Sequence, residues 1–219
     1  WNGNVKKYKI CLNASCGTLG SIIDANNKPV VDDTDPNKPV FRKDVQSFWS
    51  AGVDGKKTTL GGAGGMITDH EEVTLFTDRK DSNPVENTNN TTLNQPGFKF
   101  EAADVNSSDL STMRSAVCKN PSATQGSECE KRMLWLLGKK HITEPDTDVN
   151  STTRWAVGDV MHSAPTVITY GGTPGQVFFD KIVYGSNSGM LHMINGDSGH
   201  EEWRYLPSDF WPAQRQLFD

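Results

Sequence analysis

Near its C-terminal end the chain reads Val183-Tyr-Gly-Ser-Asn-Ser-Gly-Met-Leu-His-Met-Ile-Asn-Gly-Asp-Ser-Gly-His-Glu-Glu-Trp203. Gly189 permits a tight turn between two short apolar strands, and Gly199 permits the next turn. We expect Asp197 to hold that second turn by accepting backbone N–H groups in an Asx-turn. Trp203 then returns on the last strand as a large anchor. This rhythm predicts an antiparallel meander of the kind that forms one blade of a β-propeller.

The whole chain has the composition of a loop-rich β protein. Of its 219 residues, 35% are hydrophobic, 20 are glycine and 11 are proline. We therefore expect a mainly β fold with short strands, short helices and long polar excursions. The net charge is −5, and no basic patch is present that could neutralise phosphates. These features argue against a nucleic-acid partner.

The sequence divides into three segments by composition and hydrophobic pattern. Residues 1–77 carry the first short strands, and residues 78–153 form a polar, variable insertion. Helical spacing within this insertion predicts short helices over 109–116 and 130–137. Residues 154–219 carry the meander. The glycine-rich run 61–65 is expected to be too flexible for the interior of a helix or strand.

The four cysteines fall into two locally spaced pairs, Cys11 with Cys16 and Cys118 with Cys129. Neither spacing is the two-residue gap of a zinc knuckle or a redox motif. The pattern favours two local disulfides over a metal site. Disulfides indicate an oxidising compartment, namely the periplasm, the cell surface or the medium.

Several motifs occur in a fixed order along the chain. Upstream of the meander, residues 154–165 read Arg-Trp-Ala-Val-Gly-Asp-Val-Met-His-Ser-Ala-Pro and include Asp159 and His162. The chain opens with Trp-Asn-Gly-Asn-Val-Lys-Lys-Tyr over residues 1–8. Between these two motifs lie residues 24–32, 47–49, 54–55 and 61–65. In this order the motifs resemble those of the PilC/PilY family of type IV pilus tip proteins.

The resemblance implies a fold and a function together. The fold would be a partial, modified quinoprotein-like β-propeller in which Trp203 docks onto the neighbouring blade, and the rest of the propeller would come from sequence outside this chain. Such proteins are exported through the periplasm to the outer membrane, the cell surface and the pilus tip. There they adhere to surfaces or host cells, promote pilus assembly and oppose retraction. The implied partners are minor pilins and a host-cell or surface receptor, and no catalytic activity is implied.

Two other functions remain open from the sequence. One is a pyrroloquinoline-quinone dehydrogenase of the same propeller class, although the adjacent cysteines typical of that class do not occur here. The other is a structural propeller that docks minor pilins without adhering. A serine hydrolase is disfavoured because no Gly-x-Ser-x-Gly elbow is present. Asp159 and His162 are better interpreted as residues that hold a turn by hydrogen bonds.

A calcium site is the one metal hypothesis that the residues suggest. Asp146, Asp148 and Asn150 alternate as oxygen ligands do at the start of many calcium loops. The positions where an EF-hand needs Gly and Glu hold Ser151 and Val157. The competing interpretation is a polar linker without metal. The family's own calcium loop would lie beyond residue 219.

The insertion is the segment where we expect specific recognition. Loops displayed on a rigid scaffold are where binding proteins vary their surface. On this hypothesis, deleting residues 80–108 leaves the fold intact and weakens binding.

Overall fold

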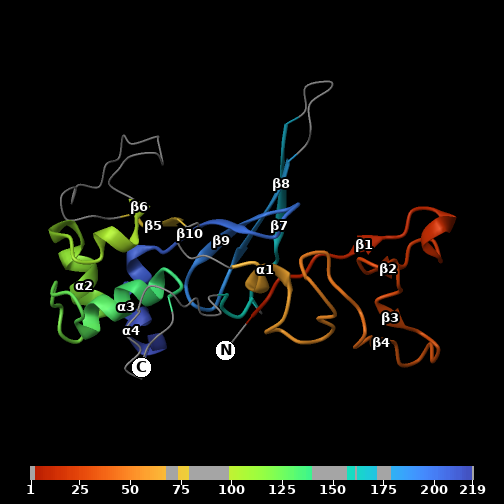
Figure 1. The fold of residues 1–219 in the computed structure, drawn as a ribbon, viewed down its shortest axis with the longest axis horizontal. Coiled ribbons are helices and arrows are strands. Elements are labelled where there is room, and N and C mark those ends of the chain that lie inside the picture. The colour runs from red at the N-terminus through yellow and green to blue at the C-terminus, as the bar shows by residue number, and fades with distance from the viewer. Residues whose placement is uncertain are drawn as a thin grey trace.

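A mixed six-stranded sheet forms the centre of the molecule. The computed structural model describes residues 3–67, 74–78, 99–139, 157–160, 162–171 and 179–218. The strand order in the sheet is β6-β5-β10-β9-β8-β7. Helices gather at the β6 end of this sheet, and two small hairpins lie at the far side of the molecule (Figure 1). The bounds of the sheet strands are β5 Thr74–Phe76, β6 Lys99–Phe100, β7 Thr166–Tyr170, β8 Phe179–Gly185, β9 Leu191–Asn195 and β10 Glu201–Tyr205.

The C-terminal meander forms as the sequence predicts. Strands β7, β8, β9 and β10 pair antiparallel with their neighbours in chain order. Gly189 adopts a positive φ of 77° in the turn between β8 and β9. A side chain there would be strained, and it would also meet the Phe210 ring at 3.0 Å. The ladder shifts register between Glu201 and Trp203, which indicates a bulge at the start of β10.

The outer edge of the meander is extended by a strand from far earlier in the chain. β5 pairs parallel with β10, with Thr74 opposite Trp203 and Phe76 opposite Tyr205. β6 then pairs antiparallel with β5. Just beyond β5, the Asp78 carboxylate accepts the Ser208 backbone N–H at 2.6 Å, which fixes the two chain segments side by side. The three segments of the sequence therefore contribute strands to one sheet.

The propeller expectation is wrong. The described strands form one six-stranded and two two-stranded sheets, and no closed barrel or ring of blades occurs among them. In a blade of four strands, β10 would leave its outer edge unpaired. Here that edge is taken by β5, so that a four-stranded antiparallel unit becomes a six-stranded mixed sheet.

Helices cover the β5–β6 end of the sheet and form the larger core. Their bounds are α2 Ser111–Val117, α3 Glu128–Leu136 and α4 Trp211–Phe218, with 3₁₀ turns η2 Ala102–Asp104, η3 Ser108–Leu110 and η4 Ser208–Phe210. The fully buried members of this core include Leu75, Phe100, Met133 and Leu136. Phe100 and Val105 are core residues, so the expectation that residues 80–108 are dispensable for folding is wrong.

Helix α3 has clear start and stop signals. The Ser127 hydroxyl accepts the Glu130 backbone N–H at 3.1 Å at the N-terminus of α3. Gly138, with φ 95°, follows its last turn. The disulfide between Cys118 and Cys129 joins the end of α2 to the start of α3, with Cα atoms 5.3 Å apart. The local pairing expected from the sequence is confirmed.

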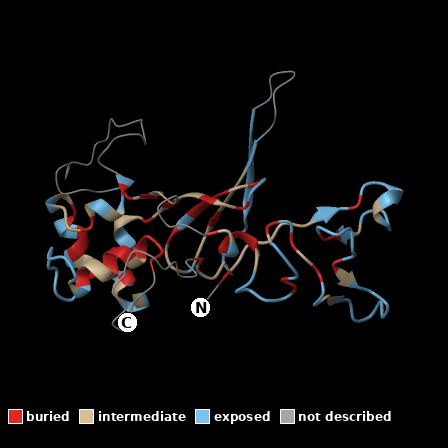
Figure 2. Cartoon of the chain, in the orientation of Figure 1, coloured by how far each residue is buried: buried red, intermediate tan, exposed pale blue. Residues whose placement is uncertain are grey.

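A smaller lobe is built from two short hairpins. Its elements are β1 Lys9–Ile10, β2 Ile22–Ile23, β3 Val31–Asp32, β4 Val40–Phe41 and the 3₁₀ turn η1 Ala14–Cys16. The Cys11–Cys16 disulfide closes the loop after β1, as predicted. Asp24 is fully buried, and its carboxylate accepts the backbone N–H groups of Asn26, Lys28 and Gln46. Most of this lobe is otherwise exposed (Figure 2).

Candidate functional site

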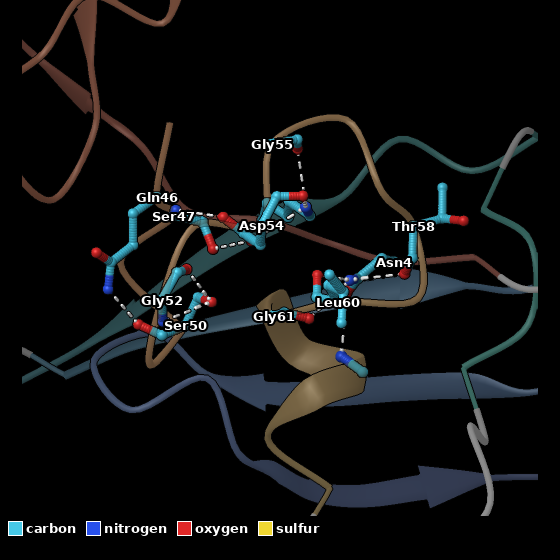
Figure 3. A network of polar contacts seen from close by, with 12 residues as sticks. Asn4, Gln46, Ser47, Ser50, Gly52, Asp54, Gly55, Thr58, Leu60 and Gly61 are labelled. Carbon is cyan, nitrogen blue, oxygen red and sulfur yellow. Dashed lines mark hydrogen bonds and ion pairs between the residues drawn. The ribbon is translucent and has the colours of Figure 1, made fainter. Parts of the chain in front are cut away.

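The N-terminal segment is held by the side chain of Asn4. Its Nδ2 donates to the backbone oxygens of Thr58 at 3.0 Å and Gly61 at 2.8 Å (Figure 3). Its Oδ1 accepts the backbone N–H of Gly64 at 3.0 Å. One amide side chain thus satisfies polar backbone groups on a loop more than fifty residues away. The effect is to join the first motif of the sequence to the glycine-rich one.

The glycine-rich run forms a one-turn helix, α1 Gly62–Gly65, and the expectation of no regular structure there is wrong. Gly62 has φ 60°, and a Cβ there would lie 2.6 Å from both Asn4 Oδ1 and the backbone oxygen of Val5. The Ala63 N–H donates to that same oxygen at 2.8 Å. Glycine is needed because the N-terminal segment approaches so closely, and these contacts offset its conformational entropy.

Asp54 lies at the centre of a second buried network in the same region (Figure 3). Its carboxylate accepts both the backbone N–H and the hydroxyl of Ser47 at 2.7 Å. Lys6 Nζ lies 3.0 Å from Asp54 Oδ2 and also donates to the backbone oxygen of Gly55. Asp54 is only 2% exposed. A buried carboxylate needs such partners, and here every one comes from the ordered motifs.

The indole of Trp49 packs against the turn that follows β9 and contains Gly196 and Gly199. It is 1% exposed, and its Nε1 donates to the backbone oxygen of Asp197 at 3.2 Å. A Cβ on Gly199 would lie 2.4 Å from Trp49 Cγ. Lys7 Nζ donates to the backbone oxygen of Gly196 in the same turn at 2.6 Å. With Ala63, Ile67, Val157, Tyr184 and Ile194, Trp49 forms the second hydrophobic core.

The sequence assigned this anchoring role to Trp203 instead. Trp203 lies on β10, is partly buried, and packs edge-on against Phe76 with ring centroids 6.5 Å apart. The described residues provide no neighbouring blade for it to dock onto. The Asx-turn expected from Asp197 is made by Asn195, whose Oδ1 accepts the N–H groups of Asp197 and Ser198. The Asp197 side chain is mostly exposed.

Asp159 and His162 lie next to the turn between β8 and β9. The Asp159 backbone oxygen accepts the Asn187 N–H at 2.7 Å, and the Asn187 side chain lies 3.2 Å from His162 Nδ1. Gly3 donates to the backbone oxygen of Val157 just before them. The 154–165 motif is thereby joined to both the N-terminal segment and the meander.

A separate polar cluster is formed by His192 on β9, by Glu201 and Arg204 on β10, and by Ser186 in the turn before β9. Ser186 is partly buried, and the other three side chains are fully buried. His192 Nε2 lies 2.9 Å from Ser186 Oγ, and its Nδ1 lies 2.5 Å from Glu201 Oε1. Arg204 binds both oxygens of Glu201 and donates to the backbone oxygen of Leu136 at the end of α3. This last bond connects the sheet to the helical core.

The protonation state of this cluster is set by its charges. Burial alone raises the pKa of Glu201, but the charges and hydrogen bonds of Arg204 and His192 outweigh burial and lower it to about 2. Burial raises the pKa of the neighbouring Tyr184, whose ring stacks on His192 at 5.0 Å. The distances also fit a serine–histidine–carboxylate relay. However, Arg204 already neutralises the carboxylate that would stabilise an imidazolium, so we assign the cluster to structure.

The calcium hypothesis stays a prediction. Its residues Asp146, Asp148 and Asn150 lie outside the described residues. Within the part of the chain that the structure describes, no group of three His, Cys, Asp or Glu residues could hold a metal ion. No helix in that part is long and apolar enough to cross a membrane.

The residues of the sequence motifs therefore mostly support the fold, because they contact one another and the meander. Comparison with known proteins found no matching family model, no curated relative and no similar solved structure.

Proposed function

We propose that this chain is part of an exported type IV pilus tip-associated protein that acts by binding, adheres to surfaces or host cells, and promotes pilus assembly. The observation that supports this most is the convergence of the ordered motifs. Asn4, Asp54, Trp49 and Asp159 come from four separate motifs, yet each binds or packs against another of the motifs or the meander.

Four of the motifs share one hydrophobic core with the meander. Val5, Trp49, Ala63 and Val157 come from these four motifs, and Tyr184 and Ile194 come from the meander. The proposal rests on this shared core and does not require a propeller. The two disulfides fit an extracellular or periplasmic protein.

The function can be tested in the bacterium that encodes the chain. Disrupting the gene should reduce surface pili, as measured by recovery of sheared pilin and by electron microscopy. Because the proposed protein opposes retraction, disabling the retraction motor in the same strain should restore the pili. The protein, detected by an epitope tag, should be recovered with the sheared pili.

Two outcomes separate the proposal from its alternatives. Adhesion that stays lost after the pili are restored supports an adhesin, whereas normal adhesion supports a structural factor that docks minor pilins. Unchanged piliation, with the protein absent from sheared pili, refutes the pilus assignment altogether.

A further inference from the structure

Among the described strands, β7 forms one edge of the central sheet. It is the last strand in the order β6-β5-β10-β9-β8-β7 and pairs only with β8 there. All five residues of β7 are exposed, with Val167 at 60% and Tyr170 at 49%. The β7–β8 hairpin projects away from the body of the molecule, and both of its strands are exposed toward the far end (Figures 1 and 2). Its outward backbone groups are thus a template for another strand.

Within the described residues, this edge carries neither charges nor proline in the strand, and it is not unusually short. Natural edge strands are blunted by charges, by proline within the strand or by short length. Residues 163–179, which run from before β7 to the start of β8, contain no Asp, Glu, Lys or Arg. The opposite edge, β6, differs because it is two residues long, begins with Lys99 and is followed by Glu101.

The geometry points to a second copy of this chain as the strand that covers β7, paired antiparallel about Ile168. The sequence Thr166-Val-Ile-Thr-Tyr170 is self-complementary in that register. Ile168 lies opposite Ile168 of the second copy, Val167 opposite Thr169, and Thr166 opposite Tyr170. Each of these is a β-branched or aromatic pair of the type that stabilises neighbouring strands. The arrangement is a twofold-symmetric contact that continues one sheet through both molecules.

Charge does not oppose this pairing. On β8, Lys181 lies opposite Ile168, so two copies of Lys181 occupy one cross-sheet row in the dimer. Each is already paired with Glu202 of its own chain. A neutral edge also offers no charge that would select a foreign strand, whereas the self-complementary pattern favours another copy.

The contact is small, and the association is correspondingly weak. A pair of five-residue strands buries less than the roughly 1,600 Å² of a standard protein interface. We therefore expect a reversible dimer that forms over about 10 to 500 μM chain. This inference concerns the purified chain alone, so it stands or falls independently of the pilus proposal.

Sedimentation equilibrium of the full chain tests it. Wild type should shift from monomer to dimer with concentration, and Ile168→Lys should raise the dimer dissociation constant at least about tenfold, because it places two ammonium groups face to face at the axis. Leu12→Lys is the matched control, since Leu12 is 79% exposed on the distant small lobe. Its dimer should be unchanged. Circular dichroism and the melting temperature check that each variant folds.

Two further measurements test the register. An equimolar mixture of Ile168→Lys and Ile168→Asp should form a heterodimer that neither variant forms alone. Ile168→Cys should oxidise to a covalent dimer linked through residue 168, whereas Val167→Cys should not, because it faces Thr169. A monomer at every concentration overturns the inference, including the case in which the edge accepts only a strand of another protein. A dimer that is insensitive to Ile168→Lys, or open-ended assembly, also overturns it.

Discussion

The contact between Trp49 and Gly199 can be measured as a coupling energy. Gly199→Ala places a methyl group 2.4 Å from Trp49 Cγ, at a residue with φ 78°. The positive φ alone costs an alanine about 1–2 kcal/mol. Overpacking against the indole adds about 1–3 kcal/mol. We therefore expect Gly199→Ala to lower the free energy of unfolding by about 2–5 kcal/mol.

Removing the indole should relieve only the steric part of this cost. Trp49→Ala alone should cost about 3–5 kcal/mol, as for other buried tryptophans. In that background Gly199→Ala should cost only about 1–2 kcal/mol, which gives a coupling energy of about 1–3 kcal/mol. Gly126→Ala is the matched control, because Gly126 also has φ 78° but no neighbouring atom lies within 4 Å of the place that its Cβ would occupy.

The assay is urea unfolding with the disulfides intact, followed by circular dichroism and analysed by linear extrapolation. Gly126→Ala should show the backbone cost alone. The reasoning is refuted if Gly199→Ala costs no more than Gly126→Ala, or if its cost is the same with and without the indole.

Three other perturbations have expected outcomes. The folded state lowers the pKa of Glu201 from 4.5 to about 2. The ionised carboxylate therefore adds roughly 3 kcal/mol to the free energy of unfolding above about pH 4.5, and this stabilisation is lost as the pH falls toward 2. The stability difference between wild type and Glu201→Gln, measured by urea unfolding, should therefore shrink over that range. Replacing both Cys118 and Cys129 by serine opens a loop with a sequence separation of 11 and should cost about 3 kcal/mol in the same assay. Asn4→Ala should cost about 0.5–1.5 kcal/mol because exposed and half-buried backbone groups lose their hydrogen-bond partner. Asn4→Asp should not rescue this loss, because a carboxylate cannot donate to carbonyl oxygens.

For each of these predictions, one experimental outcome would contradict it. A constant difference between wild type and Glu201→Gln down to pH 2 would mean that the carboxylate is not held ionised by its partners. Unchanged unfolding of the serine double variant would mean that the bridge does not constrain the unfolded chain. Full rescue by Asn4→Asp would mean that the bonds donated by the amide contribute nothing.

Local features of the fold could be predicted from the sequence because their causes are local. The β8–β9–β10 meander follows from alternating apolar residues and glycine turns, such as the one at Gly189. Helix α2 follows from helical spacing, and helix α3 follows from helical spacing and the glycine at its end. Both disulfides follow from short cysteine spacings in the chain.

Long-range features could not be predicted, and these decided the fold class. Nothing near Thr74–Phe76 in the sequence indicates a parallel partner in β10. Likewise, a tryptophan side chain packs against the turn at Gly199, but the sequence does not indicate which of the six tryptophans this is. The contact that does so spans 148 residues. The ordered motifs contained Trp49 and Asp54, yet their roles required the spatial arrangement to be known.

The parallel pairing of β5 with β10 has a consequence for how the protein is made. The Ser208 hydroxyl and N–H meet the Asp78 carboxylate across 130 residues. During synthesis on the ribosome, β5 and β6 therefore emerge long before the strand that receives them. Until then Leu75 and Phe100 lack the later-made members of their core, namely Met190, Leu206 and Trp211. The larger core can therefore close only after residue 211 has been synthesised.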